Sequence, residues 1–101
     1  MDKLKTPEID ELFRGILSLQ SIDECYDFFK DLCTVKEIID MSQRLKVAKM
    51  LNEKIAYQEI VEKTGISSAT ISRVSRCLEY GNGGYKSVIS KLNEKKADKN
   101  L

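Results

Sequence analysis

The chain has 101 residues, 42% of them hydrophobic and 33% charged, with a formal net charge of +1. This length and composition predict one globular domain with a small core, and no apolar run approaches the roughly 20 residues that cross a membrane. Histidine is absent, which removes the commonest general base and zinc ligand and argues against an enzyme. The residues after Met1 lack the apolar segment of a secretory signal, so we expect a cytoplasmic protein.

Two amphipathic helices are predicted in the first third of the chain. Thr6 can cap the first helix, because Pro7 follows at a position where a missing N–H costs nothing. Ser21 and Glu24 have the spacing of a capping box at the start of the second helix. Apolar residues recur at helical spacing, namely Ile9, Leu12, Phe13, Ile16 and Leu17, and then Ile22, Cys25, Phe28, Phe29 and Leu32. Each of these apolar stripes needs another surface to bury it.

A longer third helix is predicted after a second capping box, formed by Thr34 and Glu37. Its end is expected near Asn52. The apolar residues that recur along it are Ile38, Ile39, Met41, Leu45, Ala48 and Leu51.

Glycines separate the remaining predicted helices. A short helix is expected from Tyr57 to Thr64, and Gly65 can then adopt the positive φ that ends it. Ser67 or Ser68 can cap the next helix, which runs to about residue 80.

The run Gly81-Asn82-Gly83-Gly84 is the strongest break in the chain. A last helix is predicted over residues 85–96, followed by a frayed tail at 97–101. No segment alternates as a strand does. The predicted fold is therefore all-α, with about six helices in a single domain that spans residues 1–101.

The segment from residue 57 to residue 80 has the layout of a helix-turn-helix. Ile60 and Val61 are placed to face inward on the first helix, and Gly65 lies where the chain must reverse within a few residues. Ile71 and Val74 are placed to face the first helix from the second. This apolar set would fix the angle between the two helices.

The outward positions of the second helix suit the major groove of DNA. They are short hydroxyl or methyl side chains and two arginines: Ser67, Ser68, Ala69, Thr70, Ser72, Arg73 and Arg76. Small residues allow close approach, hydroxyls can bond bases or phosphates, and arginine can bond guanine through two N–H groups. No acidic residue occurs between Gly65 and Leu78. These residues are therefore the predicted DNA-binding surface.

The charge is unevenly divided along the chain. Residues 1–42 carry 5 Lys/Arg and 10 Asp/Glu, a net charge of −5, whereas residues 43–101 carry 12 and 6, a net charge of +6. The basic half suggests an anionic partner. Its candidate phosphate contacts are Lys54, Lys63, Lys86 and Lys91, although a single lysine is more often a solvated surface charge.

The run from Gln58 to Arg73, and above all Ala69-Thr70-Ile71-Ser72-Arg73, resembles the DNA-reading segment of the Trp repressor (TrpR) superfamily. Within it the chain looks most like the YerC/YecD-type TrpR-related proteins of Gram-positive bacteria. The resemblance implies an interlocked homodimer in which residues 1–53 form the dimerisation helices. It also implies a bacterial, nucleoid-associated repressor that binds a palindromic operator through two successive major grooves.

The resemblance also implies a slot for a small effector beside the reading helix. A gap-free alignment places Cys33, Gln43, Arg73, Val74 and Cys77 at the slot positions, and only Arg73 keeps the family's residue. Gln43 supplies no cation to stack on an indole ring, and Val74 adds a branched side chain where the family leaves space. We therefore expect that L-tryptophan is not the corepressor. Another effector, or none, remains open.

No metal or other cofactor is expected. The three cysteines, Cys25, Cys33 and Cys77, lie at apolar helical positions without a C-x-x-C pair, so we expect buried side chains rather than a zinc site or disulfide. Redox sensing is the alternative.

Two other classes of function are weighed against DNA binding. The helix-turn-helix could serve as a protein-interaction module without specific DNA binding. An enzyme could use the carboxylate pairs Asp23/Glu24 or Glu59/Glu62, but these fit a first helical turn and a solvated helix face.

Overall fold

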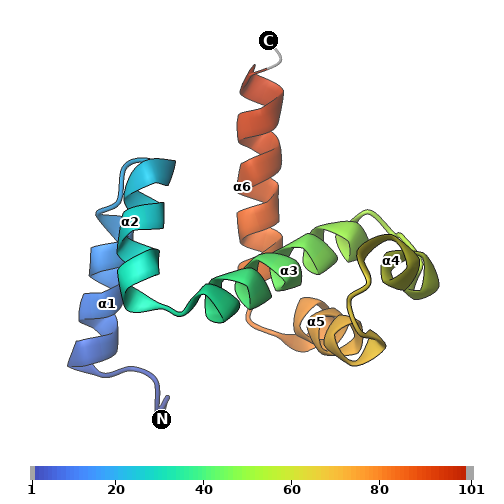
Figure 1. The fold of residues 1–101 in the computed structure, drawn as a ribbon, viewed down its shortest axis with the longest axis horizontal. Coiled ribbons are helices and arrows are strands. Elements are labelled where there is room, and N and C mark those ends of the chain that lie inside the picture. The colour runs from blue at the N-terminus through green and yellow to red at the C-terminus, as the bar shows by residue number, and fades with distance from the viewer. Residues whose placement is uncertain (1, 100–101) are drawn as a thin grey trace. The chain divides into compact units, whose positions relative to one another are not determined.

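A computed structural model describes residues 2–99, and side chains as far as residue 96. The described residues form six α-helices and no strand, as the sequence predicts (Figure 1). The chain divides into two compact units, residues 1–38 and 39–101, and α3 (Val35–Asn52) runs across the division. Each unit is described by itself below.

The first unit contains α1 (Pro7–Leu17) and α2 (Ile22–Leu32). The hydroxyl of Thr6 accepts the N–H of Ile9 at 3.2 Å, and the hydroxyl of Ser21 accepts the N–H of Glu24 at 3.1 Å. These bonds satisfy N–H groups that have no partner inside the helix. Both predicted caps are confirmed.

Neither α1 nor α2 buries a single residue, although both have strongly apolar faces. Leu17 is 83% exposed, Ile22 is 75% exposed and Phe13 is 55% exposed. Large apolar side chains that are exposed together are uncommon on a soluble monomer and are typical of contact surfaces. The helices of the first unit therefore lack a core of their own.

The start of α3 is a complete capping box. The N–H of Thr34 donates to Oε1 of Glu37 at 2.8 Å, and the N–H of Glu37 donates to the hydroxyl of Thr34 at 3.1 Å. The backbone bond, followed by the side-chain bond from Thr34, lowers the pKa of Glu37 from its ordinary value of 4.5. The ionised carboxylate also suits the positive end of the helix.

The end of α3 is a Schellman motif without glycine. The N–H of Ile55 donates to the carbonyl of Met50 at 3.1 Å, and the N–H of Lys54 donates to that of Leu51 at 2.9 Å. Lys54 occupies the left-handed position with φ 66°, where glycine is the usual residue. Ile55 then packs against the core of the second unit.

That core lies where four helices of the second unit meet. Its buried residues come from α3, from α4 (Tyr57–Thr64) and the turn after it, from α5 (Ser68–Tyr80) and from α6 (Gly84–Lys99): Val47, Ala48, Ile60, Ile66, Ile71, Val74 and Ile89. Figure 1 shows α4 and α5 at the end of α3, while α6 runs away from them. Among residues 84–96, only Ile89 is buried.

The link between α5 and α6 depends on glycine at Gly81. A Cβ atom there would clash with the backbone carbonyl of Cys77. After the link, α6 continues to Lys99, past residue 96 at which the sequence predicts its end. The last two residues of the predicted tail, 100–101, lie outside the described residues.

The expected burial of the cysteines is wrong. Cys25 and Cys77 are exposed and Cys33 is half-buried, and all three are free thiols. Cys25 lies on α2, which buries no residue, and Cys77 is exposed on α5, where it lines a hollow with Arg73 and Val74.

Candidate nucleic-acid interface

A tight turn joins α4 to α5. Gly65 has a φ of 72°, and its N–H donates to the carbonyl of Val61 at 2.8 Å. On either side of it, Ile60 and Ile71 are 0% exposed and Val74 is 2% exposed. The buried contacts therefore fix one side of α5 against α4, as the spacing of these residues predicts.

The N-terminus of α5 is held by a pair of hydroxyl groups. The hydroxyl of Ser67 accepts the N–H of Thr70 at 3.2 Å and donates to Oγ1 of Thr70 at 3.0 Å. Of the two possible caps, Ser67 is therefore the one used. Its hydroxyl is engaged within the chain, and Ser68 is free to face outward.

The opposite side of α5 is exposed and carries no negative charge through Leu78. Six of the seven predicted DNA-binding residues are exposed: Ser67, Ser68, Ala69, Ser72, Arg73 and Arg76. The seventh, Thr70, is half-buried. The structure therefore gathers the whole predicted set on one stretch of a rigid helix.

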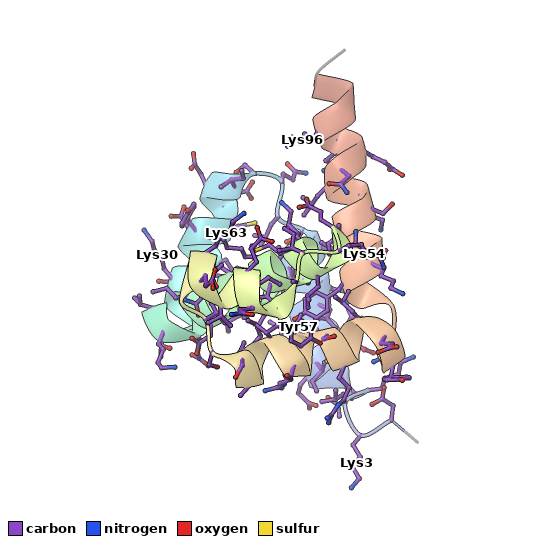
Figure 2. The ribbon with its side chains drawn as sticks, turned by 90° about the vertical axis from the view of Figure 1, so that its right-hand side faces the viewer. Lys3, Lys30, Lys54, Tyr57, Lys63 and Lys96 are labelled. Atoms are coloured by element: carbon purple, nitrogen blue, oxygen red, sulfur yellow. The ribbon has the colours of Figure 1, made fainter. Side chains whose placement is uncertain are left out.

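The four lysines predicted to contact phosphates differ in their local contacts. The Nζ atom of Lys63 lies 3.1 Å from Oε1 of Glu59. Because both side chains are at least half exposed to solvent, this ion pair adds little stability. Lys54 and Lys86 line a hollow together with Tyr57 of α4 and with Ser75 and Glu79 of α5. Figure 2 labels Lys54, Tyr57 and Lys63. Lys91 is exposed on α6.

A smaller and more enclosed hollow of about 170 Å³ lies beside α5. Its lining contains three of the predicted effector-slot residues, Arg73, Val74 and Cys77, and no acidic residue; the others are Arg44, Thr70 and Tyr85. Two guanidinium groups without a carboxylate make this hollow suited to an anion.

Gln43 is not among the residues that line this hollow, whereas its neighbour on α3, Arg44, is, and the assignment of Gln43 to an effector slot stays a prediction. Arg44 lies three and four residues before the buried Val47 and Ala48, so helical periodicity turns it toward the same side. The assignment of Cys33 stays a prediction, since it ends α2 in the other unit.

The described residues contain no group of three or more side chains that could hold a metal ion. They also contain no helix with the length and apolar character that a membrane crossing requires.

Comparison with known proteins points to one family. The family model described as Trp repressor protein matches residues 7–93. The uncharacterized protein YerC of Bacillus subtilis (strain 168) is 52% identical over 94 residues, which cover 93% of this chain and 90% of YerC.

Solved structures agree with this match. A TrpR-like protein from Eubacterium eligens ATCC 27750 has 57% identity and a TM-score of 0.87, covering 90% of this chain and 94% of that chain. A second structure, from Staphylococcus aureus, has 49% identity and a TM-score of 0.87, covering 90% of this chain and 91% of that chain.

Proposed function

The chain belongs to the Trp repressor family, and on that premise we propose that it is a sequence-specific DNA-binding regulator that represses transcription. The observation that carries the proposal is the exposed, acid-free face of α5, which combines small hydroxyl side chains with Arg73 and Arg76. It would act in the cytoplasm on the DNA of the nucleoid.

In this proposal α5 enters the major groove and reads base edges. The small side chains of Ser68 and Ala69 permit close approach, and Arg73 or Arg76 forms two hydrogen bonds to guanine O6 and N7. A pair of this kind contributes about 1–3 kcal/mol of discrimination between bases. The candidate phosphate contacts remain Lys54, Lys63, Lys86 and Lys91, which would set register and orientation.

We propose that the regulator is an intertwined homodimer that reads a palindromic operator. The support is the apolar surface of α1 and α2, which have no buried residue in the single chain. Burying it against a partner would supply the core that the first unit lacks. Two reading helices would then meet half-sites about one helical turn apart.

Sedimentation equilibrium tests the dimer. We expect a mass twice the 11.5 kDa of one chain, and a shift toward the monomer in Leu17→Glu, because a charge is costly in a buried interface. Leu4→Glu is the matched control, since Leu4 is also exposed but precedes α1. A wild-type protein that sediments as a monomer at micromolar concentration would refute the dimer.

The hollow lined by Arg44, Arg73, Val74 and Cys77 is proposed as the effector slot. L-tryptophan is not proposed as its ligand, because Val74 and the small volume oppose a large ring. DNA binding would then depend on another small molecule or on none.

The alternative is a protein-interaction module built on the same scaffold, and the acidic first half of the chain favours it. Selection from a randomised duplex library separates the two functions. A DNA-binding regulator enriches one palindromic motif, and its affinity falls steeply with salt because phosphate contacts release counterions. An interaction module enriches no motif.

A further inference from the structure

Thr64, the last residue of α4, forms two hydrogen bonds across the turn of the helix-turn-helix. Its hydroxyl donates to the carbonyl of Ile60 at 2.6 Å and accepts the N–H of Ile66 at 3.1 Å. The side chain is half-buried, whereas Gly65 between the two bonded partners is exposed. One hydroxyl thus connects the last turn of α4 to the first residue beyond the left-handed glycine.

These two hydrogen bonds help to set the direction in which α5 begins. Ile66 is 7% exposed and packs in the core directly before the Ser67 cap. Among the described residues, Thr64 supplies the acceptor for the Ile66 N–H. A buried N–H without an acceptor is costly, so removal of the Thr64 hydroxyl would favour a shift of the turn that exposes the Ile66 N–H to water.

We propose that Thr64 is a positioning residue for sequence recognition, because its hydroxyl fixes the angle at which α5 leaves the turn. The proposal rests on the DNA-binding function given above. Base readout depends on the placement of α5 to a fraction of an ångström, whereas phosphate attraction depends mainly on charge. Loss of the hydroxyl should therefore weaken specific binding more than non-specific binding.

The test compares Thr64→Val with Thr64→Ser. Valine keeps the shape but lacks the hydroxyl, and serine keeps the hydroxyl. Ser42→Ala is the matched control, because the hydroxyl of Ser42 also bonds a carbonyl of its own helix, that of Ile39 at 2.7 Å, but spans no turn. Affinity is measured for the duplex that the wild-type protein enriches from a randomised library and for a scrambled duplex of the same composition.

We expect Thr64→Val to weaken binding to the enriched duplex by about three- to tenfold, the range of one lost hydrogen bond. Binding to the scrambled duplex should change less than about twofold. Thr64→Ser and Ser42→Ala should both bind as the wild-type protein does. In the same Thr64→Val variant, the amide hydrogen of Ile66 should exchange faster with solvent, while amides in the middle of α5 stay protected.

Equal weakening on both duplexes, or unchanged affinity for the enriched duplex, would overturn the role of Thr64. Either result leaves the DNA-binding function standing, because the wild-type protein has by then selected a sequence. Failure of the wild-type protein to enrich any sequence would instead overturn the proposed function, and the role of Thr64 with it.

Discussion

Arg44 on α3 and Arg73 on α5 line the same hollow, and the described residues supply neither of them with an ion-pair partner. Two arginines that line one hollow whose lining holds no carboxylate favour an anion there. The hollow and the proposed DNA-binding surface share two residues, the half-buried Thr70 and the exposed Arg73. A molecule bound in the hollow would therefore contact Arg73, an arginine proposed to read DNA.

Replacement of Arg73 by alanine should abolish most of the sequence preference without unfolding the protein. The expected loss on the selected duplex is about 1–3 kcal/mol, the range for one base-reading arginine. Because Arg73 is exposed, the free energy of unfolding should change by less than about 0.5 kcal/mol. Fluorescence anisotropy and thermal melting measure the two quantities.

Lys95→Ala is the charge-matched control, since it removes one positive charge from α6. Equal loss of affinity in the two variants would assign the effect of Arg73 to net charge. A fall in melting temperature that matches the loss of binding would assign it to folding.

L-tryptophan should leave the protein unchanged. A ligand that binds the folded chain raises its stability by RT ln(1 + [L]/Kd), and the 170 Å³ hollow narrowed by Val74 leaves poor space for an indole ring. Melting curves in millimolar L-tryptophan should match those in L-leucine at the same concentration. A saturable rise in melting temperature with L-tryptophan alone, together with tighter DNA binding, would contradict this expectation.

Lys54→Gly should stabilise the protein. The left-handed conformation at Lys54 costs a residue with a Cβ atom about 1–2 kcal/mol, and glycine avoids this cost. Glycine also raises the conformational entropy of the unfolded chain, which offsets part of the stabilisation. We expect a net gain of roughly 0.5–1 kcal/mol in urea unfolding. Lys54→Ala keeps the Cβ atom and loses the charge, so it should show no such gain. An equal gain in both variants would mean that charge, not backbone strain, is responsible.

The N-terminus of α3 should weaken in acid because of Glu37. The pKa of this carboxyl is lowered by the N–H and hydroxyl of Thr34, so its ionised form is favoured in the folded protein. The stabilisation is fully present above the ordinary pKa of 4.5 and is lost as the pH falls through the lower, folded-state pKa. NMR titration of the Glu37 side chain should show this lowered midpoint.

Two variants check the cause of the Glu37 shift. Thr34→Ala removes the hydroxyl and should move the Glu37 pKa part of the way back toward 4.5. Glu37→Gln should make the exchange protection of the Thr34 amide independent of pH in this range. An unshifted Glu37 in the wild-type protein would refute the assignment.

Local signals in the sequence were sufficient to predict the helices and the exposed face of α5. Thr6, Ser21 and Thr34 each cap the helix that follows, because a hydroxyl one position before an apolar repeat has a fixed target in the backbone. Gly65 adopts the positive φ that its place in the pattern requires. The exposed face of α5 could be predicted because Ile71 and Val74 fix which side of the helix is buried.

Features that depend on how distant segments pack were harder to predict. The place of Arg44 at the hollow depends on how α3 packs against α5, which no local pattern in either helix specifies. The exposure of Cys25 depends on whether α2 has a partner surface within its own chain, and an apolar repeat cannot tell an intramolecular partner from a second copy. Lys54 in a Schellman motif also departs from the glycine rule used to find helix ends.

Chromatin immunoprecipitation of the tagged protein in its native host, sequenced genome-wide beside the Arg73→Ala variant, is the sharpest test of sequence-specific DNA binding through α5. We expect sharp peaks that share a palindromic motif and vanish in the variant expressed at the same level. Peaks without a common motif, or a pattern that the variant reproduces, would contradict sequence-specific DNA binding through α5 and favour the protein-interaction module.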